Sequence, residues 1–209
     1  MPPRDTNHPS APSAKFPPIA RWAALLWMLL WAPAYWLSWG PINFLHLCDI
    51  AVILTCIGFW INSRLLISSQ AVSTLFVGIA WALDAGWQAV LGHHLIGGTE
   101  YLFDASHPFW VRLLSFYHIA IVIVLLWALR RVGYDGRAFA LQTAIALATL
   151  AASRLTPPAM NLNYAFTDPF FHRAWGPAPA HVAVTIIFVA VVGYLPTHLF
   201  FAKFFPQRG

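Results

Sequence analysis

Long apolar stretches almost free of charge constrain this chain more than any other feature. Residues 22–62 contain one charged side chain, Asp49, and residues 68–91 contain only Asp84. Each stretch exceeds the roughly 20 residues that an α-helix needs to cross a bilayer. Charged residues make up 9% of the chain, against about 25% in a typical soluble domain. Too few polar side chains remain to coat a water-soluble globule, so the sequence predicts an integral membrane protein.

Apolar runs separated by chain breakers predict an all-α bundle of about six transmembrane helices. The expected spans cover residues 20–39, 43–61, 69–91, 109–130, 136–155 and 180–203. Residues 1–18 are rich in proline, serine and alanine and are expected to form a disordered cytoplasmic tail. Residues 19–205 are then a single transmembrane domain.

The distribution of basic residues predicts the orientation of the bundle. Cytoplasmic loops of membrane proteins carry an excess of lysine and arginine. With both termini in the cytoplasm, nine basic residues lie inside and three outside; the outer ones are Arg112, Arg154 and Arg173. The positive net charge follows from this topology. Nucleic-acid binding is not expected, because it needs a basic face on a soluble module.

Ionisable side chains inside the predicted spans are the first candidates for function. Each costs at least about 2.5 kcal/mol near the bilayer centre, so it marks either a site or a buried pair. The candidates are His46, Cys48, Asp49, Asp84 and His118. At a rise of about 1.5 Å per residue, Cys48, Asp84 and His118 lie roughly 8, 11 and 13 Å below the outer ends of their spans. Three helices therefore bring reactive groups to a similar depth in the outer half of the membrane.

Cys48 is a candidate nucleophile. A thiol in apolar surroundings keeps its proton unless a base lies close by. On a regular helix His46 points about 200° away from Cys48 but shares a face with Asp49, which it can neutralise. His118 is therefore the better general base. The competing reading is that Cys48, like Cys56, only fills space; about 12 Å separates the two cysteines, which is too far for a disulfide.

Asp84 has several predicted partners. It shares a helix face with Gln88 at position i+4 and can orient His118. It can equally form a structural ion pair with Arg112 or Arg154. The sequence leaves these alternatives open.

The outer loop Asn161-Leu162-Asn163-Tyr164 carries amide and phenol groups with little charge. Such groups suit hydrogen bonding to a carbonyl, an oxyanion or a lipid headgroup. They are equally typical of a closed turn.

No metal or other cofactor is predicted. A zinc site can be drawn from the outer histidines with an acidic residue, from His93, His94, His107, His172, His181, Glu100 and Asp104. The HExxH pattern and paired cysteines typical of zinc sites are both absent from the sequence.

Three short motifs together resemble the YwaF-like family of small bacterial integral membrane proteins. They are His46-Leu47-Cys48-Asp49, the membrane histidine His118, and Asn163-Tyr164, and the likeness runs loosely from residue 43 to residue 201. That family is similar to a eukaryotic transmembrane acyltransferase that remodels ether phospholipids. The resemblance implies intramembrane acyl transfer in a bacterial inner membrane, with Cys48 as nucleophile and His118 as general base.

The leading hypothesis is thus a lipid acyltransferase or transacylase of the outer leaflet, with membrane lipids as its partners. Its outer position faces away from cytoplasmic acyl-CoA, so a phospholipid is the expected acyl donor. Six residues are expected to bind substrate or support the site: His46, Asp49, Asp84, Gln88, Asn163 and Tyr164.

Two alternatives belong to other classes. One is a non-enzymatic protein that binds a lipid or small apolar ligand. The other is a proton-coupled carrier that uses Asp49, Asp84 and His118 as a relay, which is less favoured because no internal repeat is evident.

Overall fold

Helices make up about three quarters of the structure, a computed structural model that describes residues 15–206. No strand occurs in that part of the chain, in agreement with the all-α prediction. The elements, in order, are α1 (Pro18–Trp39), η1 (Pro41–Leu45), α2 (Leu47–Trp60), α3 (Arg64–Leu91), α4 (Glu100–Phe103), α5 (Phe109–Leu114), α6 (Tyr117–Val132), α7 (Ala138–Ser153), η2 (Pro158–Met160), η3 (Leu162–Tyr164), α8 (Ala178–Phe188), η4 (Val189–Tyr194) and α9 (Leu195–Phe204).

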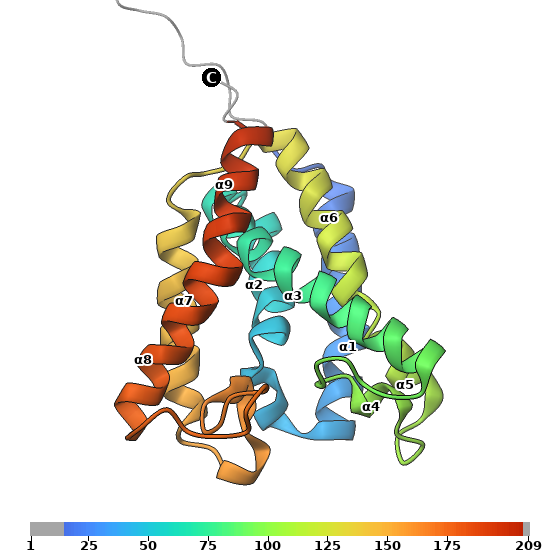
Figure 1. The fold of residues 1–209 in the computed structure, drawn as a ribbon. Helices are drawn as coiled ribbons and strands as arrows, with labels where there is room; N and C mark the ends of the chain where they lie inside the picture. Colours follow the sequence, from blue (N-terminus) through green and yellow to red (C-terminus); the bar gives the residue numbers. More distant parts are fainter. Residues whose placement is uncertain (1–14, 207–209) are drawn as a thin grey trace, which may run out of the picture.

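The long helix α3 lies at the centre of the bundle. It crosses the molecule obliquely, with α1 and α6 to one side and α7, α8 and α9 to the other (Figure 1). Its neighbours are α2, α6, α7, η4 and α9. Polar side chains line much of its buried surface, including Ser68, Ser69, Gln70 and Ser73. A helix that is buried among others can carry such groups because they bond to neighbouring helices instead of facing lipid.

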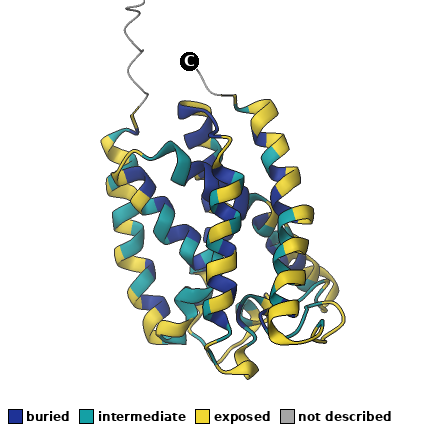
Figure 2. Ribbon diagram, turned by 90° about the vertical axis from the view of Figure 1, so that its left-hand side faces the viewer, coloured by how far each residue is buried: buried dark blue, intermediate teal, exposed yellow. Residues whose placement is uncertain are grey.

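Three helical segments are long and apolar enough to cross a membrane. They are α3, the α5–α6 segment Phe109–Val132 and the α8–α9 segment Ala178–Phe204. The helices α2 and α7 are apolar but shorter. Large apolar side chains such as Leu37 and Val90 are more than 80% exposed, and exposed residues follow the outer faces of the helices (Figure 2). That surface suits lipid; the count of six crossings stays a prediction.

Several predicted spans are interrupted. The second is broken at His46, whose φ of −62° and ψ of 135° are extended, so α2 begins only at Leu47. The prediction that His46 and Asp49 share a regular helical face is therefore wrong. The fourth span breaks between Leu114 and Tyr117, and the sixth contains the short π-helical segment η4. The third begins earlier than expected because Ser63 caps it, accepting a hydrogen bond of 3.1 Å from the Leu66 N–H.

Most of the predicted tail, residues 1–14, lies outside the described residues. Its last part is ordered: Phe16 is 2% exposed and packs edge-on against Phe59, with ring centroids 4.9 Å apart. The Phe16 N–H also donates to Asn62 Oδ1 at 3.1 Å. The chain therefore joins the bundle just before α1 begins.

Basic residues gather at one end of the bundle. Arg21 at the start of α1 donates to Asn62 in the turn before α3, and the Tyr134 N–H after α6 donates to the Phe205 carbonyl after α9. Together with the contact between Arg64 at the start of α3 and Asp135 after α6, at 3.9 Å, these contacts bring the start of α1, the α2–α3 turn, the α6–α7 turn and the end of α9 to one end. The grouping agrees with the predicted charge asymmetry; the cytoplasmic placement of this end stays a prediction.

A buried carboxylate at this basic end predicts a pH-dependent stability. Asp135 is 2% exposed and accepts hydrogen bonds of 3.0 and 2.8 Å from the Arg137 guanidinium, with Arg64 at 3.9 Å. The bonds from Arg137 hold the pKa of Asp135 below its usual range. Folding thus favours the carboxylate, so its stabilisation is present above the unfolded pKa of about 4 and is lost as the pH falls through the lowered folded pKa.

We expect Asp135→Asn to lower the thermal midpoint of the detergent-solubilised protein at pH 7. The variant should also lose less stability than the wild type between pH 5 and pH 3, an interval of about two units around the unfolded pKa. Thermal midpoints across that range test this. Parallel curves for the two proteins would contradict it.

Candidate functional site

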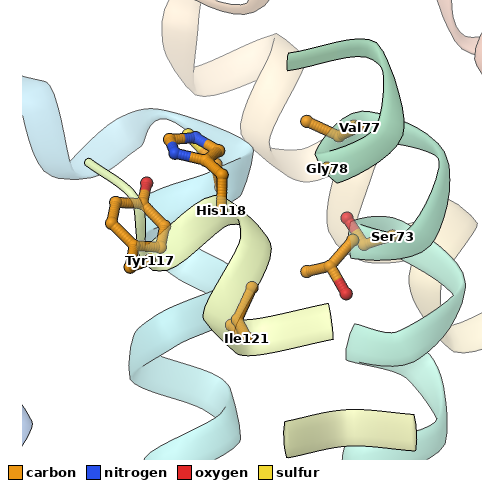
Figure 3. A pocket seen from close by; sticks show the side chains of 8 residues that line it. Ser73, Val77, Gly78, Tyr117, His118 and Ile121 are labelled. Carbon is orange, nitrogen blue, oxygen red and sulfur yellow. The ribbon is translucent and has the colours of Figure 1, made fainter. Parts of the chain in front are cut away.

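A small cavity lies where α2, α3 and α6 meet. Its lining consists of Cys48, Ser73, Thr74, Val77, Gly78, Tyr117, His118 and Ile121. Its volume of about 10 Å³ is close to the least that one water molecule needs. Figure 3 shows Tyr117, His118 and Ile121 on α6 and Ser73 and Val77 on α3 around this space. The structure thus brings the predicted nucleophile and the predicted base, 70 residues apart in the sequence, to one cavity.

The imidazole of His118 is held firmly in place. It stacks between Tyr117, with centroids 4.1 Å apart, and Trp81, with centroids 4.9 Å apart and an interplanar angle of 3°. Its Nδ1 lies 2.8 Å from the Ser115 carbonyl oxygen. A carbonyl oxygen can only accept, so Nδ1 carries the proton and Nε2 of the neutral ring is free to act as a base.

The break between α5 and α6 makes this arrangement. Ser115 and Phe116 separate the two helices, and α6 begins at Tyr117. The Ser115 carbonyl accepts from both the backbone N–H and the ring of His118. The Ser115 hydroxyl is in turn bonded to Tyr35 Oη of α1, at 2.9 Å. The Ser115 carbonyl, left without an α-helical partner at the end of α5, therefore orients the His118 ring.

Asp49 is buried beside the thiol. It is 1% exposed and accepts hydrogen bonds of 2.7 Å each from Tyr117 Oη and Asn43 Nδ2. The Cys48 Sγ lies 4.0 Å from Asp49 Oδ1. The predicted neutralisation of Asp49 by His46 is wrong, because His46 belongs to the extended turn before α2 and the carboxylate is satisfied by other partners.

Asp84 anchors an outer loop instead of serving the cavity. Its Oδ1 accepts from the backbone N–H groups of residues 95, 96 and 97 at 2.8, 2.6 and 2.9 Å. Its Oδ2 accepts from His94 Nδ1 at 2.9 Å and from the Thr99 hydroxyl. The loop after α3 therefore folds back over the end of its own helix.

Three predicted partners of Asp84, His118, Arg112 and Arg154, are wrong, whereas Gln88 does lie at position i+4 on the same helix. Both of its oxygens are occupied by the loop, so it does not orient His118. Arg112 donates to the Leu102 carbonyl and Arg154 to the Ala165 carbonyl, both at 3.1 Å. Gln88, on the same helix, has a buried side-chain oxygen without a hydrogen-bond partner among the described residues.

Asn163 clamps the turn that precedes Cys48. Its Nδ2 donates to the Leu45 carbonyl at 2.7 Å and its Oδ1 accepts from the Leu47 N–H at 2.9 Å. Its own φ of 52° is a conformation that asparagine tolerates well. The outer loop thus fixes the entry into α2 and, with it, the position of the thiol.

The rest of that loop closes on itself. Asn161 accepts from the backbone N–H groups of Phe166 and Thr167 at 2.9 and 3.1 Å. The carbonyl of Tyr164 accepts from His181 Nε2 at 3.0 Å. The closed-turn reading of this segment is therefore confirmed for Asn161.

The outer histidines do not come together around a common point. In the described part of the chain, residues 15–206, no group of three His, Cys, Asp or Glu side chains lies close enough to hold a metal ion. His94 is bonded to Asp84, and the two nitrogens of His181 are bonded to the Tyr164 carbonyl and the Trp175 N–H.

Four residues of the site were not predicted from the sequence: Asn43, Trp81, Ser115 and Tyr117. Aromatic side chains within an apolar span are ordinarily interpreted as packing residues. Nothing in their spacing indicates which ring stacks on the histidine. Tyr117 carried one usable signal, its position next to His118 in the sequence.

No protein-family model, curated protein or solved structure matches this chain. The resemblance to the YwaF-like family therefore stays a prediction from short motifs. The geometry of the site is what bears on function.

Proposed function

We propose that this chain is a bacterial inner-membrane protein that transfers acyl chains between lipids, with Cys48 as nucleophile and His118 as general base. In this proposal six helices cross the bilayer, both termini are cytoplasmic, and the site lies in the outer half of the membrane. The observation that carries it is that the Cys48 thiol and the His118 imidazole line one cavity.

The state of the imidazole supports the assignment of the base. The bond from Nδ1 to the Ser115 carbonyl leaves Nε2 unprotonated in the neutral ring. The base is thus already in the tautomer that accepts a proton, as nucleophile activation requires. Burial differs between the two groups: His118 is 7% exposed, whereas Cys48 is partly open to the surface. The imidazole is therefore largely shielded from water.

The reaction balances without any further reagent. The Cys48 sulfur attacks the ester carbonyl of a phospholipid as its proton passes to His118 Nε2; the C–S bond forms, the ester C–O bond breaks, and His118 returns the proton to the departing alkoxide. A lysophospholipid hydroxyl then gives its proton to His118 and attacks the thioester carbonyl; the new C–O bond forms, the C–S bond breaks, and His118 returns the proton to the departing Cys48 sulfur.

The carboxylate of Asp49 constrains the order of these events. A negative charge 4.0 Å from the sulfur opposes a free thiolate. Proton transfer to His118 therefore accompanies the attack instead of preceding it. Hydrogen bonds from Tyr117 and Asn43 offset part of the Asp49 charge.

The other predicted supporting residues act at a distance in this proposal. Asn163 supports Cys48 by clamping the turn before α2, and Asp84 supports the outer loop. The commitment of Asp84 to that loop weighs against a proton-coupled carrier, because it removes one member of the Asp49–Asp84–His118 relay.

Covalent labelling tests the nucleophile. Both cysteines, Cys48 and Cys56, are free and lie on the same helix, so Cys56→Ser is a matched control for Cys48→Ser. We expect N-hexadecylmaleimide, a thiol reagent with a lipid chain, to label the wild type and Cys56→Ser at similar rates. Cys48→Ser should lose most of the labelling, and His118→Ala should slow it by about 10²-fold or more. Equal labelling of the wild type and Cys48→Ser would contradict the assignment of Cys48 as nucleophile.

A second measurement separates an enzyme from a lipid-binding protein. Incubation with a phospholipid carrying a deuterated acyl chain should leave that chain on Cys48 as a thioester that hydroxylamine releases. Added lysophospholipid should then take up the deuterated chain. Normal lipid retention by Cys48→Ala, with no thioester on the wild type, would favour the non-enzymatic alternative.

A further inference from the structure

The indole of Trp81 stacks on the imidazole of His118. It lies on α3, is 7% exposed, and stacks flat against the imidazole on the face opposite to Tyr117. Phe116 closes the arrangement with an edge-on contact to the indole at 5.5 Å. The imidazole is thus enclosed by aromatic rings on both faces.

The indole is itself held by the outer segment. Its Nε1 donates to Tyr101 Oη of α4 at 2.8 Å. Tyr101 lies two residues after Thr99, whose hydroxyl donates to the Asp84 carboxylate of α3. A chain of contacts therefore runs from the outer loop through Tyr101 and Trp81 to the imidazole.

An imidazolium at this position is stabilised electrostatically by both stacked rings, Trp81 and Tyr117. A cation within about 6 Å of an aromatic centroid, over the ring face, is attracted by the ring quadrupole, and tryptophan is the strongest partner. Both stacking distances at His118 fall inside that limit. The attraction acts on the protonated ring and hardly on the neutral one, so it favours transfer of the thiol proton to Nε2.

We propose that Trp81 is a positioning residue for the His118 base: held by Tyr101, its ring fixes the imidazole against Tyr117 and stabilises the imidazolium formed when His118 takes the Cys48 proton. This inference rests on the proposed function. It assigns a role to a tryptophan that the sequence marks only as a mid-span packing residue.

The test is the pH profile of Cys48 labelling, and the other titratable groups around His118 also contribute to that profile. They are Cys48 and Asp49 from α2, His46 before α2, Tyr117 on α6, Tyr35 on α1 and Tyr101 on α4. All six residues are retained in a Trp81 variant, and among them only Tyr101 loses a hydrogen bond, the one from the indole Nε1. A shift in the profile of such a variant therefore reports on the indole.

The experiment uses full-length protein in detergent, in a Cys56→Ser background, with N-hexadecylmaleimide between pH 6 and pH 9.5, about the interval in which thiols and imidazoles titrate. We expect Trp81→Leu to slow labelling roughly tenfold at neutral pH, because a less stable imidazolium makes His118 a weaker base, and to move the low-pH limb of the profile to lower pH, because that imidazolium loses its proton more readily. Trp81→Phe, which keeps an aromatic face, should recover part of the rate. Trp87→Leu is the control: it lies on the same helix, 41% exposed and away from the cavity.

A double variant separates positioning from a merely structural role. In a His118→Gln background the Trp81→Leu change should have little further effect, because the base on which it acts is gone. An unshifted profile for both Trp81 variants, or an equal slowing with and without His118, would overturn the inference. Labelling of Cys48 that does not depend on His118 would instead overturn the proposed function, so the two failures are distinguishable.

Discussion

Replacing Asp84 with alanine is expected to free residues 95–97 from the end of α3 and to destabilise the protein by about 3–5 kcal/mol. Three backbone N–H groups share Asp84 Oδ1 as acceptor, and His94 and the Thr99 hydroxyl bond to Oδ2. Each buried donor left without an acceptor costs about 1–3 kcal/mol, less where water can enter. The thermal midpoint measures the total loss, and amide hydrogen exchange at residues 95–97 locates it.

Two further variants serve as controls for this prediction. Asp84→Asn keeps an amide oxygen for the three N–H groups, so we expect it to lose less stability than Asp84→Ala. Asp104 is an exposed aspartate whose carboxylate accepts hydrogen bonds from Ser106 two residues on, so Asp104→Ala should change the midpoint little. Unaltered amide exchange at residues 95–97 in Asp84→Ala would show that the loop is held by something else.

Replacing Gly78 with alanine is expected to force α3 and α6 apart and to cost about 1–3 kcal/mol. A Cβ at Gly78 would lie 2.7 Å from the His118 carbonyl oxygen and 2.7 Å from Val122 Cγ2. The valine methyl can move, but the carbonyl belongs to the backbone of α6. Because that backbone carries the imidazole, the change should also slow the labelling of Cys48.

The same helix supplies a matched control. Gly86 also lies within α3, and a Cβ built there meets no atom within 4 Å. Gly86→Ala should therefore leave stability unchanged or raise it by up to about 1 kcal/mol, the difference in helix propensity. Thermal midpoints and Cys48 labelling rates of the two variants are compared directly. Similar effects at Gly78 and Gly86 would argue against a close crossing of α3 and α6.

The fold was largely predictable because hydrophobicity is a local property. Apolar runs at 20–39 and 136–155 became α1 and α7 with ends that differ by two residues at most. The interruptions were not predictable. Residues around His46 and Ser115 are as apolar as their neighbours. At His46 the outer loop competes for the helix backbone, because Asn163 bonds the residues on both sides of His46. At Ser115 the competing group is the His118 ring of the same segment, to which the Ser115 carbonyl is bonded.

The candidate site was predictable in part. Cys48 and His118 stood out because reactive groups are rare inside apolar spans. The partners of Asp84 could not be foreseen, since they are backbone groups of the loop that follows its own helix. Asn43 lies six residues before Asp49 and bonds to it only because the chain turns between η1 and α2.

The amino-acid sequence by itself determined that this chain forms a bundle of apolar helices, that its basic residues gather at one end, and which few reactive groups lie within the apolar spans. These properties depend on composition and on residues close together in the chain. Only the tertiary structure decided that the thiol and the imidazole share a cavity, that Trp81 and Tyr117 enclose the imidazole, and that Asp84 serves a loop. One residue of extra or missing helix turns every following side chain by about 100°, so contacts between distant helices depend on where each helix breaks and how closely α3 and α6 pack.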